Sequence, residues 1–266
     1  MLGEKSCPFA LGDIGRIDLL LASPECTSHT CARGSRPPDE ESKRTARYVL
    51  KFAAELKPRW VVVENVIHMR GWQGYAPLLE ALREQGYRVR AEVLDASRFG
   101  VPQIRKRLFI LADRERVPRR IPRKPGRSPT ARRILDPDGT WDSRPLQNER
   151  RAQATIDRAD RAIAALGTQK PFLVVYYGSD GAGGWQALNR PLRTVTTLDR
   201  FGLVTWQDHT PMLRMLQVSE LTRAMGFGED YVLDSVKQRR DRIRILGNGV
   251  APPVMQAIVQ TLTIDD

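Results

Sequence analysis

A short apolar run that leads into a cysteine-bearing loop decides how this chain folds: residues 17–27 read Ile-Asp-Leu-Leu-Leu-Ala-Ser-Pro-Glu-Cys-Thr. A brief apolar run bounded by a turn signal is typical of a buried strand. In open α/β sheets, functional loops follow the carboxyl ends of strands. Cys26 therefore stands where a partly exposed thiol can become a nucleophilic thiolate. The alternative is a buried apolar side chain, which is the commoner role of free cysteine.

The sequence around this run alternates between helical and extended patterns. Apolar residues at helical spacing predict helices, and short Val-rich or alternating runs predict strands. The predicted helices cover residues 39–57 and 76–85, and the predicted strands cover residues 60–63, 87–95 and 107–112. Strands that alternate with helices indicate an α/β fold with helices on both faces of the sheet.

The composition changes after residue 113. Residues 114–133 hold nine Lys/Arg, one Glu and four Pro, so this segment cannot bury itself and is a loop, a linker or an arm that contacts phosphates. Helices are predicted over 147–166, 219–226 and 250–263, and a flexible loop over 178–184.

The chain of 266 residues carries 43 Lys/Arg against 31 Asp/Glu, a formal net charge of +12. This balance favours a polyanionic partner such as nucleic acid, with a generally basic protein as the alternative. Three cysteines argue against a disulfide framework. No apolar stretch reaches the roughly 18 residues of a membrane span, and the first residues lack the apolar core of a signal peptide. We therefore expect a cytoplasmic protein without a membrane partner.

Three further polar motifs follow predicted strands or turns. Glu64 follows the second buried strand, where partial burial would favour its protonated form; the alternative is an ordinary surface Glu. If their segment is extended, Gln103, Arg105 and Arg107 point to one side; the alternative is a basic strand end in water. Residues 247–249, Gly-Asn-Gly, allow a tight turn and a close approach to a ligand, although such turns are common.

Taken in order, these motifs resemble the DNA cytosine-C5 methyltransferase family. The family's nucleophile loop is Pro-Pro-Cys-Gln, where this chain has Pro24-Glu25-Cys26-Thr27, and its Glu-Asn-Val and Gln-x-Arg-x-Arg motifs are present unchanged. The resemblance covers about residues 12–263 and includes Phe99-Gly100-Val101-Pro102, the Arg190–Thr197 and Leu221–Phe227 segments, and Gly247-Asn248-Gly249-Val250. It implies a Rossmann-like S-adenosylmethionine-dependent methyltransferase sheet with a small target-recognition region.

The resemblance also implies a mechanism. Cys26 would add to C6 of a cytosine flipped out of duplex DNA, and C5 would then take a methyl group from S-adenosylmethionine. Glu64 would share a proton with N3. Arg105 would stabilise the carbonyl O2 and the thiolate, with Arg107 as a weaker candidate for the same place. The implied cofactor contacts are Asp13, Pro24, Asn248 and Val250.

The resemblance divides the chain into a partial catalytic domain (1–113), a target-recognition region (114–200) and a C-terminal segment that returns to the catalytic domain (201–266). The basic stretch suits phosphate contacts, which position DNA without specifying a sequence. Contacts with DNA are implied for Gln103, Arg190 and Arg193, and Gln186 or Asn189 could pair with adenine. The setting would be restriction-modification or phage self-protection.

The chain departs from the family in two places. No Phe-x-Gly-x-Gly cofactor loop precedes Cys26, and residues 12–14 resemble the family's third cofactor motif, so we expect a sheet truncated on its N-terminal side. A misplaced start, a separate chain that supplies the missing motifs, and a remnant that binds DNA without methylating it all stay open. Glu25 would disfavour a neighbouring thiolate, but some family members carry the same Ser-Pro-Glu-Cys-Thr loop.

A zinc-binding module is a further alternative. It would use Cys7, Cys26, His29 and Cys31, whose spacing is unlike the usual Cys-x-x-Cys pairs. The apolar strand that runs into Cys26 also argues against a small metal knuckle, and we expect no metal.

Overall fold

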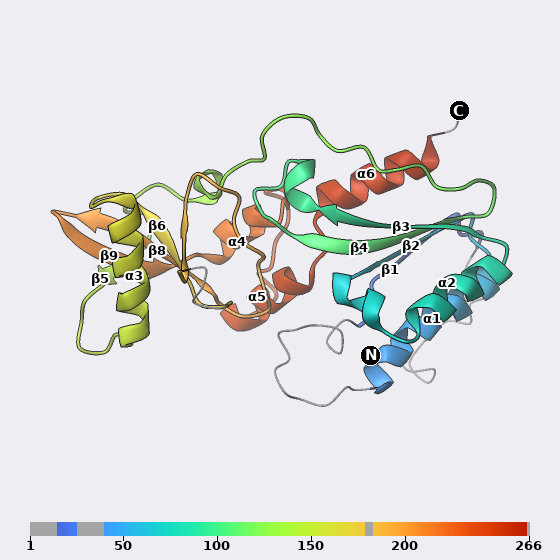
Figure 1. Ribbon diagram of the computed structural model, residues 1–266, viewed down its shortest axis with the longest axis horizontal. Helices are drawn as coiled ribbons and strands as arrows, with labels where there is room; N and C mark the ends of the chain where they lie inside the picture. Colours follow the sequence, from blue (N-terminus) through green and yellow to red (C-terminus); the bar gives the residue numbers. More distant parts are fainter. Residues whose placement is uncertain (1–14, 26–39, 179–182, 265–266) are drawn as a thin grey trace. The chain divides into compact units, whose positions relative to one another are not determined.

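The computed structural model describes residues 15–25, 40–178 and 183–264, and the chain divides into two compact units (Figure 1). Unit 1 takes residues 1–94, 106–122 and 257–266, and unit 2 takes residues 95–105 and 123–256. Each unit has its own sheet and its own hydrophobic core.

Unit 1 is built on a four-stranded sheet in the order β1-β2-β4-β3. Strand β1 (Leu19–Ala22) pairs in parallel with β2 (Trp60–Asn65), and β2 pairs antiparallel with β4 (Lys106–Asp113). Strand β3 spans Arg88–Asp95. Each predicted strand of this part of the chain is confirmed. Because β1 and β2 are parallel and β4 runs against them, the ends of β1 and β2 share one sheet edge with the beginning of β4.

Helices cover both faces of this sheet. Helices α1 (Glu40–Leu56) and α2 (Tyr75–Glu84) lie near their predicted positions. They pack on one face of the sheet through a shared cluster of buried residues: Ala46, Val49, Ala53, Leu78, Leu82, Val61, Val63, Leu108 and Ile110. Val62 and Leu111 alternate with these positions and are also fully buried, so the second face is covered too. The part of α6 (Pro252–Thr263) that begins at Ala257 belongs to unit 1 and lies on this second side (Figure 1).

Unit 2 contains a five-stranded antiparallel sheet that was not predicted. Its order is β5-β9-β8-β6-β7, with β5 at Arg144–Pro145, β6 at Phe172–Val175, β7 at Trp185–Ala187, β8 at Phe201–Gln207 and β9 at Thr210–Met215. Asp208 and His209 form the two-residue turn between β8 and β9, with φ of 44° and 65°. Hairpin turns of this kind need positive φ at both positions, which Asn-Gly usually provides, so Asp-His gave no turn signal.

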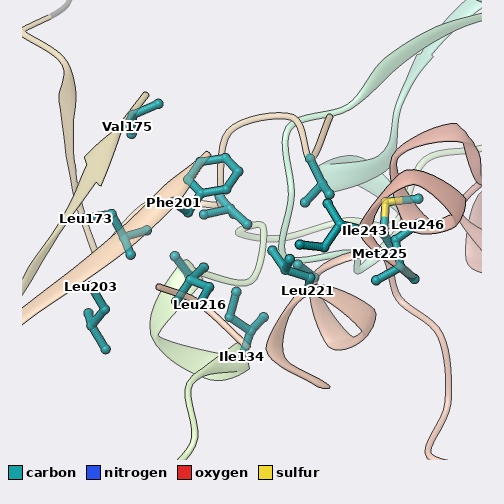
Figure 2. Packing of buried hydrophobic residues seen from close by; sticks show 14 of the residues in the cluster. Ile134, Leu173, Val175, Phe201, Leu203, Leu216, Leu221, Met225, Ile243 and Leu246 are labelled. Carbon is teal, nitrogen blue, oxygen red and sulfur yellow. The ribbon is translucent and has the colours of Figure 1, made fainter. Parts of the chain in front are cut away.

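The unit 2 sheet is buried between helices. Helix α3 (Gln153–Leu166) packs on one face through Ala159 and Ala162. The other face of the sheet packs against α4 (Val218–Ala224) and α5 (Arg239–Asn248). Figure 2 shows this hydrophobic cluster, which includes Leu173, Val175, Phe201 and Leu203 from the sheet together with Ile134, Leu216, Leu221, Met225, Ile243 and Leu246. Helix α5 was not predicted. Helix α3 begins later than residue 147, because the preceding residues form a turn in which Asn148 accepts the Arg150 N–H at 3.0 Å.

A fully buried carboxylate ties three segments of unit 2 together. Glu220, at the start of α4, is 0% exposed. It accepts two 2.7 Å hydrogen bonds from the guanidinium of Arg214 on β9. It also accepts the backbone N–H groups of Gln217 at 2.7 Å and Asp136 at 3.0 Å. The Glu220 carboxylate thus accepts hydrogen bonds from three residues, and Arg214 supplies the positive charge that compensates its buried negative charge.

Replacement of Glu220 by Gln should destabilise unit 2 strongly. Breaking a buried ion pair from one side leaves the other charge uncompensated and costs about 3–5 kcal/mol. Urea unfolding of Glu220→Gln and of Glu229→Gln, an exposed control on the loop after α4, measures this difference. Equal unfolding midpoints for the two variants would contradict the role of Glu220.

Candidate functional site

Three polar side chains meet at the edge of unit 1 where β1 and β2 end. Ser23 follows β1, Glu64 is the last but one residue of β2, and Arg107 is the second residue of β4. The Glu64 carboxylate accepts the Ser23 hydroxyl at Oε2, and its Oε1 lies 3.2 Å from Nε of Arg107. Glu64 is 7% exposed, which excludes an ordinary surface glutamate. The Glu64 carboxylate thus contacts a neutral hydroxyl at one oxygen and a positively charged guanidinium at the other.

The segment after β1 is anchored at each residue that the structure describes. The Asn65 amide donates to the Pro24 carbonyl at 3.1 Å and accepts the Val66 N–H at 2.8 Å. The Glu25 N–H donates to Thr45 of α1 at 3.0 Å. With Ser23 bound to Glu64, three successive residues have fixed partners. Cys26 comes next and, like Asp13, lies outside the described residues.

The Gln-x-Arg-x-Arg segment alternates in burial as predicted. Gln103 and Arg105 are 0% and 3% exposed, whereas Ile104 and Lys106 are exposed. Arg107 is again partly buried. The predicted alternation in burial is therefore present, and the burial of Gln103 and Arg105 contradicts the alternative of a basic strand end in water.

Gln103 and Arg105 bind backbone groups of unit 2. The Arg105 guanidinium donates to the carbonyls of Val195 at 3.0 Å, Gly247 at 2.7 Å and Gly249 at 2.9 Å. The Gln103 amide donates to the Ala224 carbonyl at 3.0 Å and accepts the Val195 N–H at 2.8 Å. Motifs that are far apart in the sequence are thereby brought together in one unit.

The segment around Thr194 is held by two further contacts. Its hydroxyl donates to the Ile104 carbonyl at 2.8 Å, and its carbonyl accepts the Tyr177 hydroxyl at 2.9 Å. Burial raises the pKa of Tyr177 to about 12, although the charge of Arg193 opposes this. Tyr177 therefore stays protonated at neutral pH and remains a donor. Neither Ser23, Asn65 nor Tyr177 was predicted as a site residue, although Ser23 and Asn65 flank predicted ones.

The residues expected to contact DNA differ in exposure. Arg190 is exposed and Arg193 is half-buried. Gln186 is buried, and its amide donates to the Pro191 carbonyl at 2.8 Å and accepts the Arg193 N–H at 3.0 Å. Gln186 thus shapes the turn that carries Arg193 and offers no free amide to an adenine.

The residues expected to hold a cofactor are partly described. Pro24 lies beside Glu64 in unit 1 through its contact with Asn65. In unit 2, Asn248 is exposed at the last position of α5 and Val250 is half-buried. An exposed amide and an adjacent apolar side chain fit the polar and apolar parts of a nucleoside. The four residues of the zinc hypothesis lie outside the described residues. In the described part of the chain, no helix has both the length and the apolar character that crossing a membrane requires.

Comparison with known proteins gives a consistent result. A family model for C-5 cytosine-specific DNA methylases matches residues 4–263. The type II methyltransferase M.MspI of Moraxella sp. is 27% identical over 70% of this chain and 41% of its own length. The type II methyltransferase M.AgeI of Thalassovita gelatinovora is 26% identical over 82% of this chain and 49% of its own. The chain therefore spans less than half the length of these curated relatives.

Solved structures share the fold. The Dnmt2 methyltransferase of S. pombe aligns over 92% of this chain and 76% of its own, with a TM-score of 0.61 and 17% identity. A DNMT2 mutant from Spodoptera frugiperda aligns over 94% and 80%, with a TM-score of 0.64 and 17% identity. The expected S-adenosylmethionine-dependent methyltransferase fold is therefore confirmed.

Substitution of Gly247 by Ala should disrupt the turn that Arg105 holds. An added Cβ would lie 2.4 Å from the Thr196 carbonyl oxygen and 2.5 Å from the Thr197 nitrogen, and crowding of this kind costs about 1–3 kcal/mol. Thermal unfolding of Gly247→Ala measures it. Gly71→Ala is the control, because a Cβ there meets nothing within 4 Å; equal melting temperatures would refute the prediction.

Proposed function

Because the chain belongs to the C-5 cytosine-specific DNA methylase family, we propose that it methylates C5 of cytosine in duplex DNA, with S-adenosylmethionine as the methyl donor. The observation that carries this proposal is the Ser23–Glu64–Arg107 cluster at the sheet edge. Ser23 precedes Cys26 by three residues in the sequence. A nucleophile, a proton-sharing carboxyl group and a cation are what addition to a cytosine ring requires.

The proposed reaction begins with a covalent bond between the Cys26 sulfur and C6. The C5–C6 π electrons shift to the C4–C5 bond and the C4–N3 π electrons shift to N3, where Glu64 shares a proton with the developing negative charge. S-adenosylmethionine would supply the methyl group, which would pass from the sulfonium sulfur to C5 and leave S-adenosylhomocysteine. The C5 proton then leaves to a base and the Cys26 sulfur is expelled, which restores the aromatic ring. A stacked cytosine cannot be reached in this way, so the base is flipped out of the duplex.

The geometry favours Arg107 over Arg105 as the cation beside the ring. On cytosine, N3 and the carbonyl carbon of O2 are adjacent, so a group that binds O2 has to be next to the group that serves N3. Arg107 contacts Glu64 directly, whereas the Arg105 guanidinium donates to three backbone carbonyls. We assign Arg107 to O2, and we assign Arg105 and Gln103 to positioning of the 195 and 247–249 segments.

The remaining assignments follow from the residues at hand. Asp13, Pro24, Asn248 and Val250 would hold the cofactor, and Arg190 and Arg193 would read base edges. The recognition region is extended to residue 215, because β8 and β9 pair with β6 and β5 in one sheet and a boundary at residue 200 would divide that sheet.

Methyl transfer from labelled S-adenosylmethionine to mixed-sequence duplex DNA tests the proposal. We expect incorporation by the 266-residue chain and none by Cys26→Ser. The alignments cover 41% of M.MspI and 49% of M.AgeI, so a parallel assay adds a polypeptide that carries a glycine-rich cofactor loop. Incorporation only in that assay would indicate a two-chain enzyme. Failure in both assays, with DNA binding retained, would indicate a DNA-binding fragment and would overturn the proposal.

Removal of the Ser23 hydroxyl should slow the reaction without weakening DNA binding. A hydrogen bond to a charged group contributes about 1.5–3 kcal/mol, so Ser23→Ala should lower kcat by roughly 10-fold to 100-fold if the bond positions Glu64 in the transition state. KM for DNA should stay the same, and Ser23→Thr should recover most of the rate. A change confined to KM would assign Ser23 to substrate binding.

A further inference from the structure

Residues 116–133, here called the basic strip, are rich in Lys and Arg and take no part in the proposed catalytic site. The chain has eight Lys/Arg and no Asp/Glu between residues 116 and 135. Seven of these side chains are exposed: Arg119, Arg120, Arg123, Lys124, Arg127, Arg132 and Arg133. Exposed cations that follow one another in the sequence with no acid between them suit a polyanionic partner.

The basic strip is held in a defined course by its uncharged residues. In unit 1, Ile121 is 4% exposed and the Pro118 carbonyl accepts Nε of Arg90 on β3. In unit 2, Ala131 and Ile134 belong to the hydrophobic core, and the Lys124 N–H donates to the Arg98 carbonyl at 2.9 Å. The apolar residues therefore face inward while the cations face solvent, so binding a partner costs little ordering of the backbone.

Within unit 1, the basic strip starts at the sheet edge opposite to Glu64. Strand β4 ends at Asp113, which pairs with Trp60 at the beginning of β2, whereas Leu108 pairs with Asn65 at the end of β2. Strands rise about 3.3 Å per residue, so the two edges are about 17 Å apart. The start of the strip is fixed at that edge, where Arg114 donates to the Pro58 and Gln85 carbonyls at 3.2 Å.

Within unit 2, the basic strip ends beside the turn that carries Arg190. The Ala131 N–H donates to the Arg190 carbonyl at 2.7 Å, and the Arg132 N–H donates to the Leu188 carbonyl at 3.1 Å. The exposed Arg132 and Arg133 are thereby next to an exposed arginine to which the proposed function gives a base contact.

We propose that the part of the basic strip that lies in unit 2, residues 123–133, is a contact surface for the phosphate backbone of duplex DNA. It adds affinity without regard to sequence, because phosphates carry no base information. This inference rests on the proposed function for the identity of the polyanion. It also divides the region first predicted as a unit: residues 123–133 bind backbone, and the sheet of residues 144–215 carries recognition.

Salt-dependent DNA binding tests the proposal. The affinity of the chain for a fluorescent duplex of about 24 base pairs is measured by anisotropy at several salt concentrations, for wild type and for the double variant Arg123→Gln/Arg127→Gln. The slope of log K against log salt is negative, and each lost phosphate contact reduces its magnitude by about 0.9. We expect the magnitude of the slope to fall by about 2 in the double variant, and we expect the same fall with duplexes of unrelated sequence.

The matched control is Arg16→Gln/Arg83→Gln, which also removes two charges. Arg16 and Arg83 each form an ion pair with a nearby acid, Asp18 and Glu80 respectively, so the slope should not change. Four outcomes would each overturn the proposal. The slope could be unchanged in the strip variant, or it could change equally in the control. The loss could be seen only with single-stranded DNA or duplex RNA, or the wild type could fail to bind duplex DNA. If the strip variant keeps its slope while Cys26-dependent methyl transfer persists, this inference fails and the proposed function stands.

Discussion

The buried guanidinium of Arg105 is the contact on which the arrangement of unit 2 depends. A cation cannot be taken out of water unless its donors find acceptors, and Arg105 finds the carbonyls of Val195, Gly247 and Gly249. Segments that lie 90 and 142 residues further along the sequence are therefore fixed to one planar group. Gln103 adds a second tie through the Val195 N–H. Some of the sequence motifs that identify the family therefore have a structural role, because their side chains hold other motifs in place. Only some of the motifs lie beside the proposed chemistry.

Unit 1 shows the complementary case, in which a short motif is itself at the proposed chemistry. Glu64 is the last but one residue of a strand that pairs in parallel with β1, so the fold alone brings the ends of these two strands to one edge. The charge and hydroxyl partners of Glu64 then come from Arg107 and Ser23. A buried polar group needs hydrogen-bond partners. Glu64 on β2 finds them in Ser23, which follows β1, and in Arg107 on β4.

The sequence predicted the part of the fold that has strong hydrophobic periodicity. The strands and α-helices that the structure describes in unit 1 were predicted, because their apolar runs are bounded by clear turn residues, whereas the short 3-10 helix Ile67–Gly71 was not. The sheet of unit 2 was missed, because β5 and β7 are very short and the Asp208–His209 turn lacks glycine. For the site, the residue types and their one-sided order could be predicted. The choice between Arg105 and Arg107 could not, because it depends on which carbonyls and carboxylates surround each guanidinium in three dimensions.

The antiparallel pairing of β4 with β2 has a consequence for how the protein can vary in evolution. Glu64 enters the sheet edge at the end of its strand and Arg107 at the start of its own, so their meeting depends on strand register. A slip of β4 by one residue would turn Arg107 to the opposite face of the sheet, as with every other side chain of that strand. Insertions and deletions between the two residues are therefore tolerable in the connecting loops and intolerable inside the ladder. The alignment of two strands is thus as much a part of this site as the identity of its residues.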